Sequence, residues 1–515
     1  MSVEYDILII GGGINGCGIA RDAAGRGYSV YLCEADDLAS GTSSQSTKLI
    51  HGGLRYLEHY EFRLVRESLT EREILWQIAP HIIHPLRFVL PHHKTLRPAW
   101  LLRLGLFLYD HIGGRKKLPA TKVLNLQIDE AGKNLRHDYK KGFEYSDCAV
   151  DDARLVILNA LDAHELGASI NTLTKCVSLK RNDKHWKVTL KNQENQALTN
   201  VTAKLVINAS GPWVDTVLNQ LYPEKNNQNI RLVQGSHIIV PKLYQHEKCY
   251  IFQNEDNRII FAIPYQLDFT LIGTTDHEYQ GDPSKTHITQ DEIDYLCSSV
   301  NHYFIKEISS TDIVGTFSGV RSLVNDNSSK AQEATRDYVL NRDKPDEDSA
   351  TLINIFGGKI TTFRRLAESV MKEVESHIGK RKKGAWTEKS HLPGGDFAAQ
   401  DYGTVIKGLH NEYPFLTHNE ITHFIKCYGT RTNQILNDIR STKDLGTHFG
   451  HGLYQKEVEY LIHTEWALTA DDILWRRTKL GLYFTQKEKE ELEIWIKKAL
   501  LNKQLKGTIH EEGHS

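Results

Sequence analysis

A glycine-rich turn near the N-terminus constrains the fold more than any other feature of the 515 residues. Residues 5–34 read YDILIIGGGINGCGIARDAAGRGYSVYLCE, in which an apolar run meets glycines spaced as G-x-G-x-x-G and then a series of small residues. The apolar run predicts a strand covered on both faces, and the small residues predict a helix packed closely on it. Gly11 permits the tight turn, Gly13 lets the backbone approach a pyrophosphate, and Gly16 lets the helix sit close to the strand. We therefore predict a dinucleotide-binding βαβ unit, against the alternative of a tight turn without a ligand.

Glu34 ends the second expected strand, residues 29–33. An acidic residue there accepts a hydrogen bond from an adenosine ribose and repels a 2′-phosphate, which disfavours NADP. The choice between NAD and FAD depends on later segments. Residues 37–53, DLASGTSSQSTKLIHGG, form a hydroxyl-rich loop where an NAD enzyme would continue with further βα units; the alternative is a flexible serine linker.

Two segments far along the chain repeat the strand–glycine–helix pattern. They are AKLVINASGPWVD, residues 203–215, and TLINIFGGKITTFRRLAE, residues 351–368. A nucleotide domain assembled from separated pieces is typical of FAD folds, so we predict FAD as the cofactor. The predicted cofactor-binding residues are Gly11, Gly13, Gly16, Glu34, Thr42, Ser43, Ser46, Lys48, His51, Gly52, Gly211, Gly358 and Lys359.

Composition narrows the function classes. The formal net charge of -2 and the absence of any nucleic-acid signature argue against a nucleic-acid partner. The seven cysteines are scattered without a CxxC pair, and the histidine pairs lack ligand spacing, so we expect no disulfide framework and no metal site. We read the N-terminus as a buried strand rather than a signal peptide. No apolar run reaches the roughly 18–20 residues that span a bilayer, so we expect an intracellular protein that can still lie on a membrane surface.

Nine segments together resemble one known family. They are GGGINGCGIARDAAGRG, TSSQSTKLIHGGLRYLEHYEFRLV, FEYSDCAVDDARL, NASGPWV, GSHIIVP, IGTTDHEY, FSGVRSLV, FGGKITTFRRLAE and ADDILWRRTKLGL. The chain resembles the FAD-dependent, quinone-linked glycerol-3-phosphate dehydrogenase of aerobic bacteria nearly from end to end. It departs from the family at Ser322, where proline is usual, and at Ala149, where tryptophan is common. Loss of the proline loosens the expected active-site loop.

The resemblance implies oxidation of glycerol 3-phosphate to dihydroxyacetone phosphate, with electrons passing from FAD to a membrane quinone. It also implies a peripheral enzyme on the cytoplasmic face of the cell membrane and a homodimer. The rival functions are an oxidase that uses oxygen, an amine or amino-acid oxidase of the same fold, and a catalytically idle FAD-bound subunit.

A phosphorylated alcohol needs cations for its phosphate, a base for its hydroxyl proton and a group that orients it. The substrate-binding residues that the resemblance implies are Arg55, Tyr56, Thr274, Thr275, Arg321 and Lys359; the catalytic residues are His237, Arg321 and Arg55. Arginine presents planar paired donors that suit phosphate. His237 titrates near neutrality and can act as the base, or it can be a structural strand-end histidine; in the latter case Arg321 stabilises an alkoxide and water takes the proton.

The expected fold class is α/β plus α+β. We predict a discontinuous Rossmann-like FAD-binding domain at residues 1–78, 150–213 and 331–385, a mainly antiparallel substrate cap at 79–149 and 214–330, and an all-helical domain at 386–515. Within the cap, residues 94–117 place large apolar side chains at helical spacing between basic residues. This segment predicts either a buried core helix or a monotopic membrane anchor.

Overall fold

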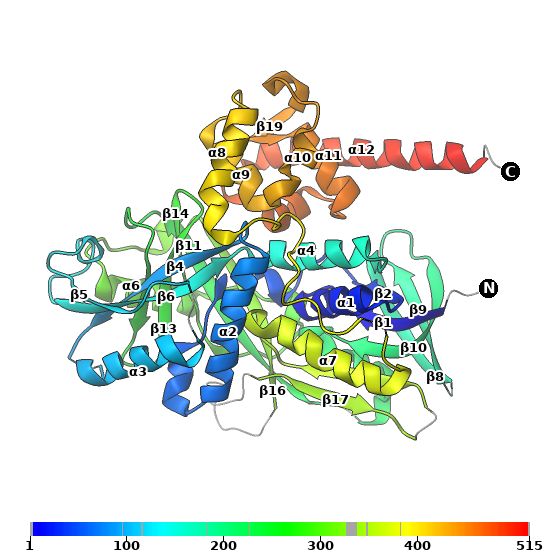
Figure 1. Cartoon of the computed structure of the whole chain (residues 1–515), viewed down its shortest axis with the longest axis horizontal. Helices are drawn as coiled ribbons and strands as arrows, with labels where there is room; N and C mark the ends of the chain where they lie inside the picture. The colour runs from blue at the N-terminus through cyan, green and yellow to red at the C-terminus, as the bar shows by residue number, and fades with distance from the viewer. Residues whose placement is uncertain are drawn as a thin grey trace. The chain divides into compact units, whose positions relative to one another are not determined.

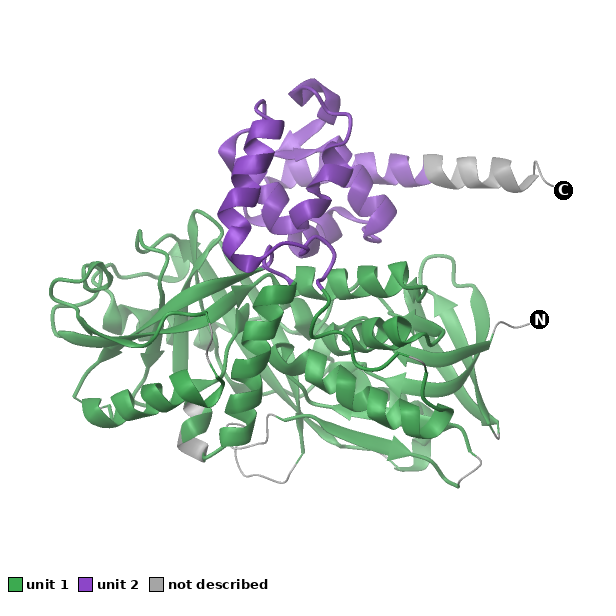
Figure 2. Ribbon diagram, viewed as in Figure 1, with its two compact units in different colours: residues 1–78, 83–390 green, residues 79–82, 391–515 purple. Residues whose placement is uncertain are grey.

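The structure is a computed structural model that describes residues 4–94, 96–114, 117–182, 184–225, 227–325, 337–346, 349–381 and 383–512 (Figure 1). The chain divides into two compact units, one formed by residues 1–78 and 83–390 and the other by residues 79–82 and 391–515 (Figure 2). The second unit begins five residues after the predicted start of the helical domain at residue 386.

The first sheet of unit 1 gathers strands from three distant parts of the chain. Its order is β17-β18-β10-β1-β2-β7, and the β8–β9 hairpin extends from β10. Its strands are β1 (Glu4–Ile10), β2 (Val30–Cys33), β7 (Ser169–Asn171), β8 (Thr174–Asn182), β9 (His185–Asn192), β10 (Leu198–Asn208), β17 (Val339–Asp343) and β18 (Thr351–Phe356). β1 pairs in parallel with β2 and β10, and β10 pairs in parallel with β18. The prediction that the segments around residues 205 and 352 return to the first sheet is therefore confirmed.

Packing on both faces of this sheet explains the continuous apolar sequence of β1. Leu8 and Ile10 join a cluster that includes Val214 and Val217 of α5 (Val214–Leu221). The side chain of Ile9 instead points to the face where α1 (Ile14–Arg26) begins. α1 packs against α4 (Asp152–Glu165) and α7 (Phe363–Ile378), which lie beside it in Figure 1. A strand covered on both sides has no position at which a polar side chain is favoured.

The second sheet of unit 1 is mainly antiparallel, as predicted for the cap. Its order is β15-β11-β14-β13-β12-β4-β6-β3, with β16 beside β11 and β5 beside β6. Its strands are β3 (Leu49–Ile50), β4 (Ile83–His92), β5 (Lys122–Asn125), β6 (Lys141–Val150), β11 (Ile230–Pro241), β12 (Cys249–Gln253), β13 (Ile259–Tyr265), β14 (Phe269–Gly273), β15 (His277–Glu278) and β16 (Gly315–Val324). One pair, β12 with β4, is parallel. The first sheet lies wholly within the ranges predicted for the FAD-binding domain, whereas β3, predicted there, joins the second sheet; the three-domain division remains our proposal.

Three helices accompany the second sheet: α2 (Phe62–Ile78), α3 (Ala99–Ile112) and α6 (Gln290–Tyr303). Leu296 and Val300 of α6 are buried in a cluster with Ile238 and Phe252 of the strands. α6 begins with a capping box in which Thr289 and Glu292 satisfy each other's backbone amides.

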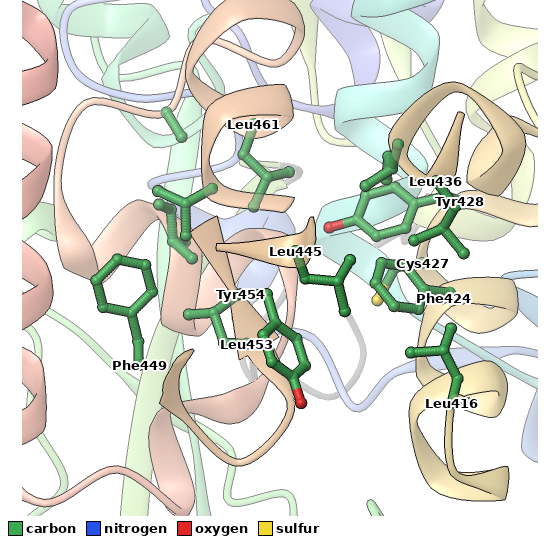
Figure 3. Close-up of a cluster of buried hydrophobic side chains, with 14 of the residues drawn as sticks. Leu416, Phe424, Cys427, Tyr428, Leu436, Leu445, Phe449, Leu453, Tyr454 and Leu461 are labelled. Carbon is green, nitrogen blue, oxygen red and sulfur yellow. The ribbon is translucent and has the colours of Figure 1, made fainter. Parts of the chain in front are cut away.

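The second unit is helical, as predicted, apart from one short hairpin. Its elements are α8 (Tyr402–Glu412), α9 (His418–Tyr428), α10 (Thr432–Leu436), β19 (His448–Gly450), β20 (Leu453–Tyr454), α11 (Gln455–Thr464) and α12 (Gln486–Glu512). Buried apolar side chains from these elements converge in one core, where Leu445, which precedes the hairpin, lies beside Phe424 of α9 (Figure 3). A capping box formed by Thr417 and Glu420 opens α9.

Candidate active site

A cavity of about 580 Å³ in unit 1 opens at the carboxyl ends of β1 and β10. Its walls come from both sheets: Gly13, Gly211 and Gly358 follow strands of the first sheet, and His237 and Arg321 lie on strands of the second. Ligands of open α/β sheets bind where the strand order reverses, and β1 is such a point because the chain continues to β2 on one side and later to β10 on the other.

The fingerprint glycines form a backbone cradle that side chains would fill. Gly11 has a φ of +110°, and a Cβ there would lie 2.7 Å from the carbonyl oxygen of Ala209. A Cβ on Gly16 would lie 1.9 Å from the carbonyl oxygen of Gly11, so α1 can approach β1 only because this residue is glycine. Gly13 precedes α1, and the first helical amide, of Ile14, donates to Ser43 Oγ at 3.0 Å. The helix N-terminus thus points its free amides and partial positive charge into the cavity, as a pyrophosphate requires.

Glu34 lines the cavity at the end of β2. Its Oε2 accepts the Gly12 amide at 2.6 Å and its Oε1 accepts the Asp36 amide at 2.9 Å. Burial raises the pKa of Glu34, while the two amides act in the opposite direction. These bonds fix the carboxyl group beside the fingerprint, where it retains lone pairs for a ribose hydroxyl.

The hydroxyl-rich loop lies along the cavity, but Lys48 does not line it. Thr42, Ser43 and Ser46 are wall residues. Lys48 Nζ is buried and donates to both oxygens of Asp152, at 3.0 and 2.9 Å, and to the Ser44 carbonyl oxygen at 2.8 Å. The buried cation is thus held by the start of α4 and fastens the loop there. In this structure Lys48 anchors the loop, and its role as a cofactor ligand stays a prediction.

The cavity wall also carries cationic groups. Arg321 Nη2 donates to the Thr275 carbonyl oxygen at 3.1 Å and lies 3.2 Å from Asp276 Oδ1. Lys359 Nζ lies 4.0 Å from the centre of the Tyr56 ring, a cation–π contact. Arg321, Lys359, Tyr56 and Thr274 all line the cavity, as does His51. The structure therefore brings most of the predicted substrate-binding residues to the wall of one cavity.

His237 is buried on β11 between aromatic and hydroxyl neighbours. Its ring stacks on Phe317, with centroids 4.6 Å apart, and its Nε2 lies 3.0 Å from Thr47 Oγ1. Burial lowers the pKa of His237 to about 3, and the nearby charges of Lys48 and Arg321 act in the same direction. The imidazole is therefore neutral near pH 7, so it has a lone pair with which to accept a proton.

Comparison with known proteins identifies the family. A family model described as FAD dependent oxidoreductase matches residues 6–344, and one described as the C-terminal domain of alpha-glycerophosphate oxidase matches residues 385–499. A glycerol-3-phosphate dehydrogenase of Pseudomonas aeruginosa is 50% identical over 495 residues, covering 96% of this chain and 95% of its own. The chain belongs to the FAD-dependent glycerol-3-phosphate dehydrogenases.

Two further relatives refine this placement. A D-erythritol 1-phosphate dehydrogenase of Brucella abortus is also 50% identical, over 496 residues, and the match covers 96% of this chain and 98% of that one. A crystal structure of the glycerol-3-phosphate dehydrogenase from Bacillus halodurans in complex with FAD has a TM-score of 0.74 and 26% identity, covering 96% of this chain and 94% of that one. The predicted family, the predicted fold class and FAD as the cofactor are thus confirmed.

The cavity fits FAD by its own chemistry. Gly11, Gly13 and Gly16 shape the pyrophosphate turn, Glu34 stands where a ribose is expected, and Thr42, Ser43 and Ser46 offer hydroxyl groups along the wall. Gly211 and Gly358 follow β10 and β18 and line the same space, as predicted.

Several sequence-based roles change with the structure. Thr275 does not line the cavity. Its hydroxyl donates to Glu292 at 2.5 Å and accepts the Ser236 amide at 2.8 Å. These two bonds help to fix the Thr275 carbonyl oxygen, which accepts a hydrogen bond from Arg321. Gly52 does not line the cavity either, and its backbone amide donates to the Tyr109 hydroxyl group instead. Gly16 acts through packing against Gly11 rather than through contact with the cavity. The side chain of Arg55 lies outside the described residues, and its predicted role stays a prediction.

Sequence reasoning missed Asp152 and Asp276, which hold Lys48 and Arg321 respectively. Both follow recognisable signals, since Asp152 comes just after the strand FEYSDCAV and Asp276 just after the paired threonines. Neither position reveals its cationic partner, because each contact joins segments far apart in the chain. Among the described residues, the structure shows no cluster of three or more His, Cys, Asp or Glu side chains suited to a metal ion.

Proposed function

We propose that the enzyme oxidises sn-glycerol 3-phosphate to dihydroxyacetone phosphate and delivers the electrons to a membrane quinone. The observation that carries the substrate is that Arg321 and Lys359 line the same cavity as the glycines of the dinucleotide fingerprint. The names of the relatives from Pseudomonas and Brucella support a phosphorylated polyol. Each charge-assisted hydrogen bond contributes about 1.5–3 kcal/mol, so two or three such bonds can hold a small dianion.

The residues divide the work between binding and proton transfer. Arg321 brings a planar guanidinium group to the cavity wall, and its paired N–H donors suit a phosphate or a developing alkoxide. Lys359 offers a point charge held over the Tyr56 ring. His237 lines the cavity in its neutral form and is the candidate acceptor of the hydroxyl proton; this role requires the bound substrate to raise its pKa from about 3 toward neutrality. FAD, when bound, supplies the two-electron acceptor that none of these side chains can provide.

Anaerobic reduction of the flavin tests the substrate. The purified holoenzyme is mixed with glycerol 3-phosphate, D-erythritol 1-phosphate, glycerol or an amino acid, and the loss of the yellow absorbance is followed. We expect fast bleaching with glycerol 3-phosphate and slow or no bleaching with glycerol and amino acids. Faster bleaching by D-erythritol 1-phosphate would make that compound the preferred substrate, the second candidate that the name of the Brucella relative supports. An absence of bleaching by any phosphorylated polyol would refute the proposal and favour an idle FAD-bound subunit.

A substitution of Arg321 tests the phosphate contact. Arg321→Ala should lower kcat/KM for glycerol 3-phosphate by about 10²-fold, the loss of two charge-assisted bonds, and should affect high concentrations of glycerol much less. Arg231→Ala is the matched control, because Arg231 lies on the neighbouring strand, pairs with Glu278 and does not line the cavity. Equal losses on both substrates would place Arg321 at the hydroxyl or the flavin instead.

The electron acceptor separates a dehydrogenase from an oxidase. We propose a quinone rather than oxygen because α3 bears an exposed apolar face beside basic residues. Trp100, Phe107, Leu104 and Leu108 are exposed by 69%, 56%, 48% and 41% of their surfaces. Stoichiometric peroxide formation under air would contradict this choice, whereas quinone reduction in membrane vesicles with little peroxide would support it.

We propose that this face of α3 lies in the headgroup region of the cytoplasmic leaflet, as a monotopic contact. Within the described residues, no helix combines the length and the hydropathy needed to cross a bilayer. The basic cluster that follows α3 includes Arg115 and Lys116, which lie outside the described residues, and Lys117. Each such cation near an anionic surface contributes about 1 kcal/mol. We also propose a homodimer, which sedimentation analysis would test.

Vesicle sedimentation tests the membrane contact. Trp100→Gln with Phe107→Gln should release the enzyme from anionic vesicles at low salt and leave activity with a water-soluble dye intact, because both side chains are exposed. Ile128→Gln with Leu198→Gln is the control, since these residues are exposed by 81% and 64% and do not belong to α3. Equal sedimentation of both double variants would place the membrane contact elsewhere.

A further inference from the structure

We propose that Tyr109 of α3 is a positioning residue for the substrate end of the cavity: its hydroxyl holds the Gly52 peptide and thereby orients Tyr56 and Lys359. The use of glycerol 3-phosphate as the test substrate rests on the proposed function, whereas the measurement of amide hydrogen exchange does not.

The first observation is a buried hydrogen-bond network that ends on Gly52. The Gly52 amide donates to Tyr109 Oη at 2.8 Å, and Tyr109 Oη in turn donates to Asp147, whose oxygens lie at 2.9 and 2.8 Å. Arg72 Nη1 donates to Asp147 Oδ1 at 2.7 Å and to the Ser146 carbonyl oxygen at 2.8 Å. Burial raises the pKa of Tyr109 well above its usual value, so the hydroxyl stays protonated and remains a donor. A satisfied buried network of this kind fixes the position of each member.

The second observation is steric. A Cβ on Gly52 would lie 2.7 Å from Tyr109 Oη and 2.4 Å from Leu69 Cδ2. Gly113, immediately after α3, is just as close to Leu69, since a Cβ there would lie 2.2 Å from Leu69 Cβ. Leu69 of α2 therefore contacts both the Gly52 loop and the end of α3. The loop can move only if α3 or α2 moves with it.

The third observation connects Gly52 with the site. Gly53 adopts a φ of +73° and starts the 3₁₀ helix Leu54–His59, and the Tyr56 ring packs so closely that a Cβ on Gly53 would lie 2.2 Å from it. Lys359 Nζ sits 4.0 Å from the centre of that ring. On the other side of Gly52, the His51 amide donates to Thr361 Oγ1 at 3.3 Å. The peptide that Tyr109 holds is thus flanked by side chains that line the cavity on both sides.

The helix that carries Tyr109 makes this contact informative. Leu106, Tyr109 and Asp110 form the buried face of α3, and Asp110 accepts the Thr121 amide at 2.8 Å. The opposite face carries the exposed Trp100 and Phe107. One hydroxyl group therefore links a helix with an exposed apolar face to the loop that shapes the substrate end of the site.

Tyr109→Phe removes this hydroxyl and keeps the ring. Tyr244→Phe is the matched control: the Tyr244 hydroxyl is also buried and donates to a backbone carbonyl, that of Ala262, at 2.7 Å, but it does not touch the loop. Both variants are purified as holoenzyme. FAD content, kcat and KM for glycerol 3-phosphate with a water-soluble dye, and amide hydrogen exchange of the peptide 49–57 are measured.

We expect Tyr109→Phe to keep full FAD content, to raise KM by about tenfold with a smaller change in kcat, and to speed exchange in peptide 49–57 by about tenfold, the loss of one hydrogen bond. Tyr244→Phe should change none of these. Unchanged KM or unchanged exchange in Tyr109→Phe would overturn the proposal, as would loss of FAD or equal effects in the control. If the unsubstituted enzyme is not reduced by glycerol 3-phosphate, the proposed function fails, and the exchange measurement alone decides the role of Tyr109.

Discussion

Replacing Lys48 by methionine should test whether this buried cation anchors the loop rather than contacting the cofactor. The substitution keeps the length of the side chain and removes the ammonium group that donates to both Asp152 oxygens and to the Ser44 carbonyl oxygen. Asp152 has no exposed surface and would lose its cationic partner, while its bonds with Ser46 and the Ala153 amide remain. Removing one partner of a buried ion pair costs about 3–5 kcal/mol, because the remaining charge stays uncompensated.

The expected shift of the unfolding midpoint follows from this loss of free energy and from the entropy of unfolding, which scales with the size of the unit. For a unit of roughly 400 residues, the entropy of unfolding is about 0.8 kcal/mol per kelvin, so the loss should lower the unfolding midpoint by about 4–6 °C. Flavin fluorescence on heating reports this midpoint at a fixed scan rate. FAD content at 20 °C should stay near stoichiometric, because Lys48 does not line the cavity.

A double-mutant cycle isolates the pair. Asp152→Asn should lower the free energy of unfolding by a similar amount. The double variant should lose little more than either single variant, because replacing both partners leaves no unpaired buried charge. The coupling free energy should therefore be close to the loss of one single variant, about 3–5 kcal/mol. Additive losses in the double variant, or a shift below about 1 °C in Lys48→Met, would refute the anchor. Loss of FAD with an unchanged midpoint of the apoprotein would restore Lys48 as a cofactor ligand.

Three further outcomes follow from the structure. Gly16→Ala should give colourless protein, because its methyl group would lie 1.9 Å from the Gly11 carbonyl oxygen; full FAD content would contradict the close packing of α1 on β1. In unit 2, burial opposes protonation of His423, but the Glu457 carboxylate, 2.7 Å from its Nε2, and Cys427 together raise the pKa of His423 well above its usual value. This pair should stabilise the unit fully below pH of about 6.5 and less as pH rises through the raised pKa, so the unfolding midpoint of His423→Gln should depend less on pH between 6 and 9. His237→Asn should lower kcat far more than FAD content; a variant with unchanged pH–rate profile would remove His237 as the base.

Residues close together in sequence determined the nucleotide end of the site. The fingerprint glycines, Glu34 and the hydroxyl loop lie within one strand–helix–strand unit, where local conformation decides which groups reach the ligand. The continuous apolar runs around residues 205 and 352 also predicted strands covered on both faces, and both runs form strands of the first sheet, β10 and β18. The sequence pattern likewise predicted the helical unit, because caps and periodicity are local signals.

Only the tertiary structure decided what the charged side chains do. Lys48 reads as a cation beside a phosphate site, yet it pairs with Asp152, more than a hundred residues later; Thr275 reads as a substrate contact, yet its hydroxyl serves Glu292. The segment 94–117 allowed a core helix or a surface helix, and the fold settled its orientation by burying Tyr109 and exposing Trp100. Sequence periodicity gives each helix an apolar face, but it cannot say which face meets a neighbour or which distant partner neutralises a charge, because those depend on contacts between segments that only folding brings together.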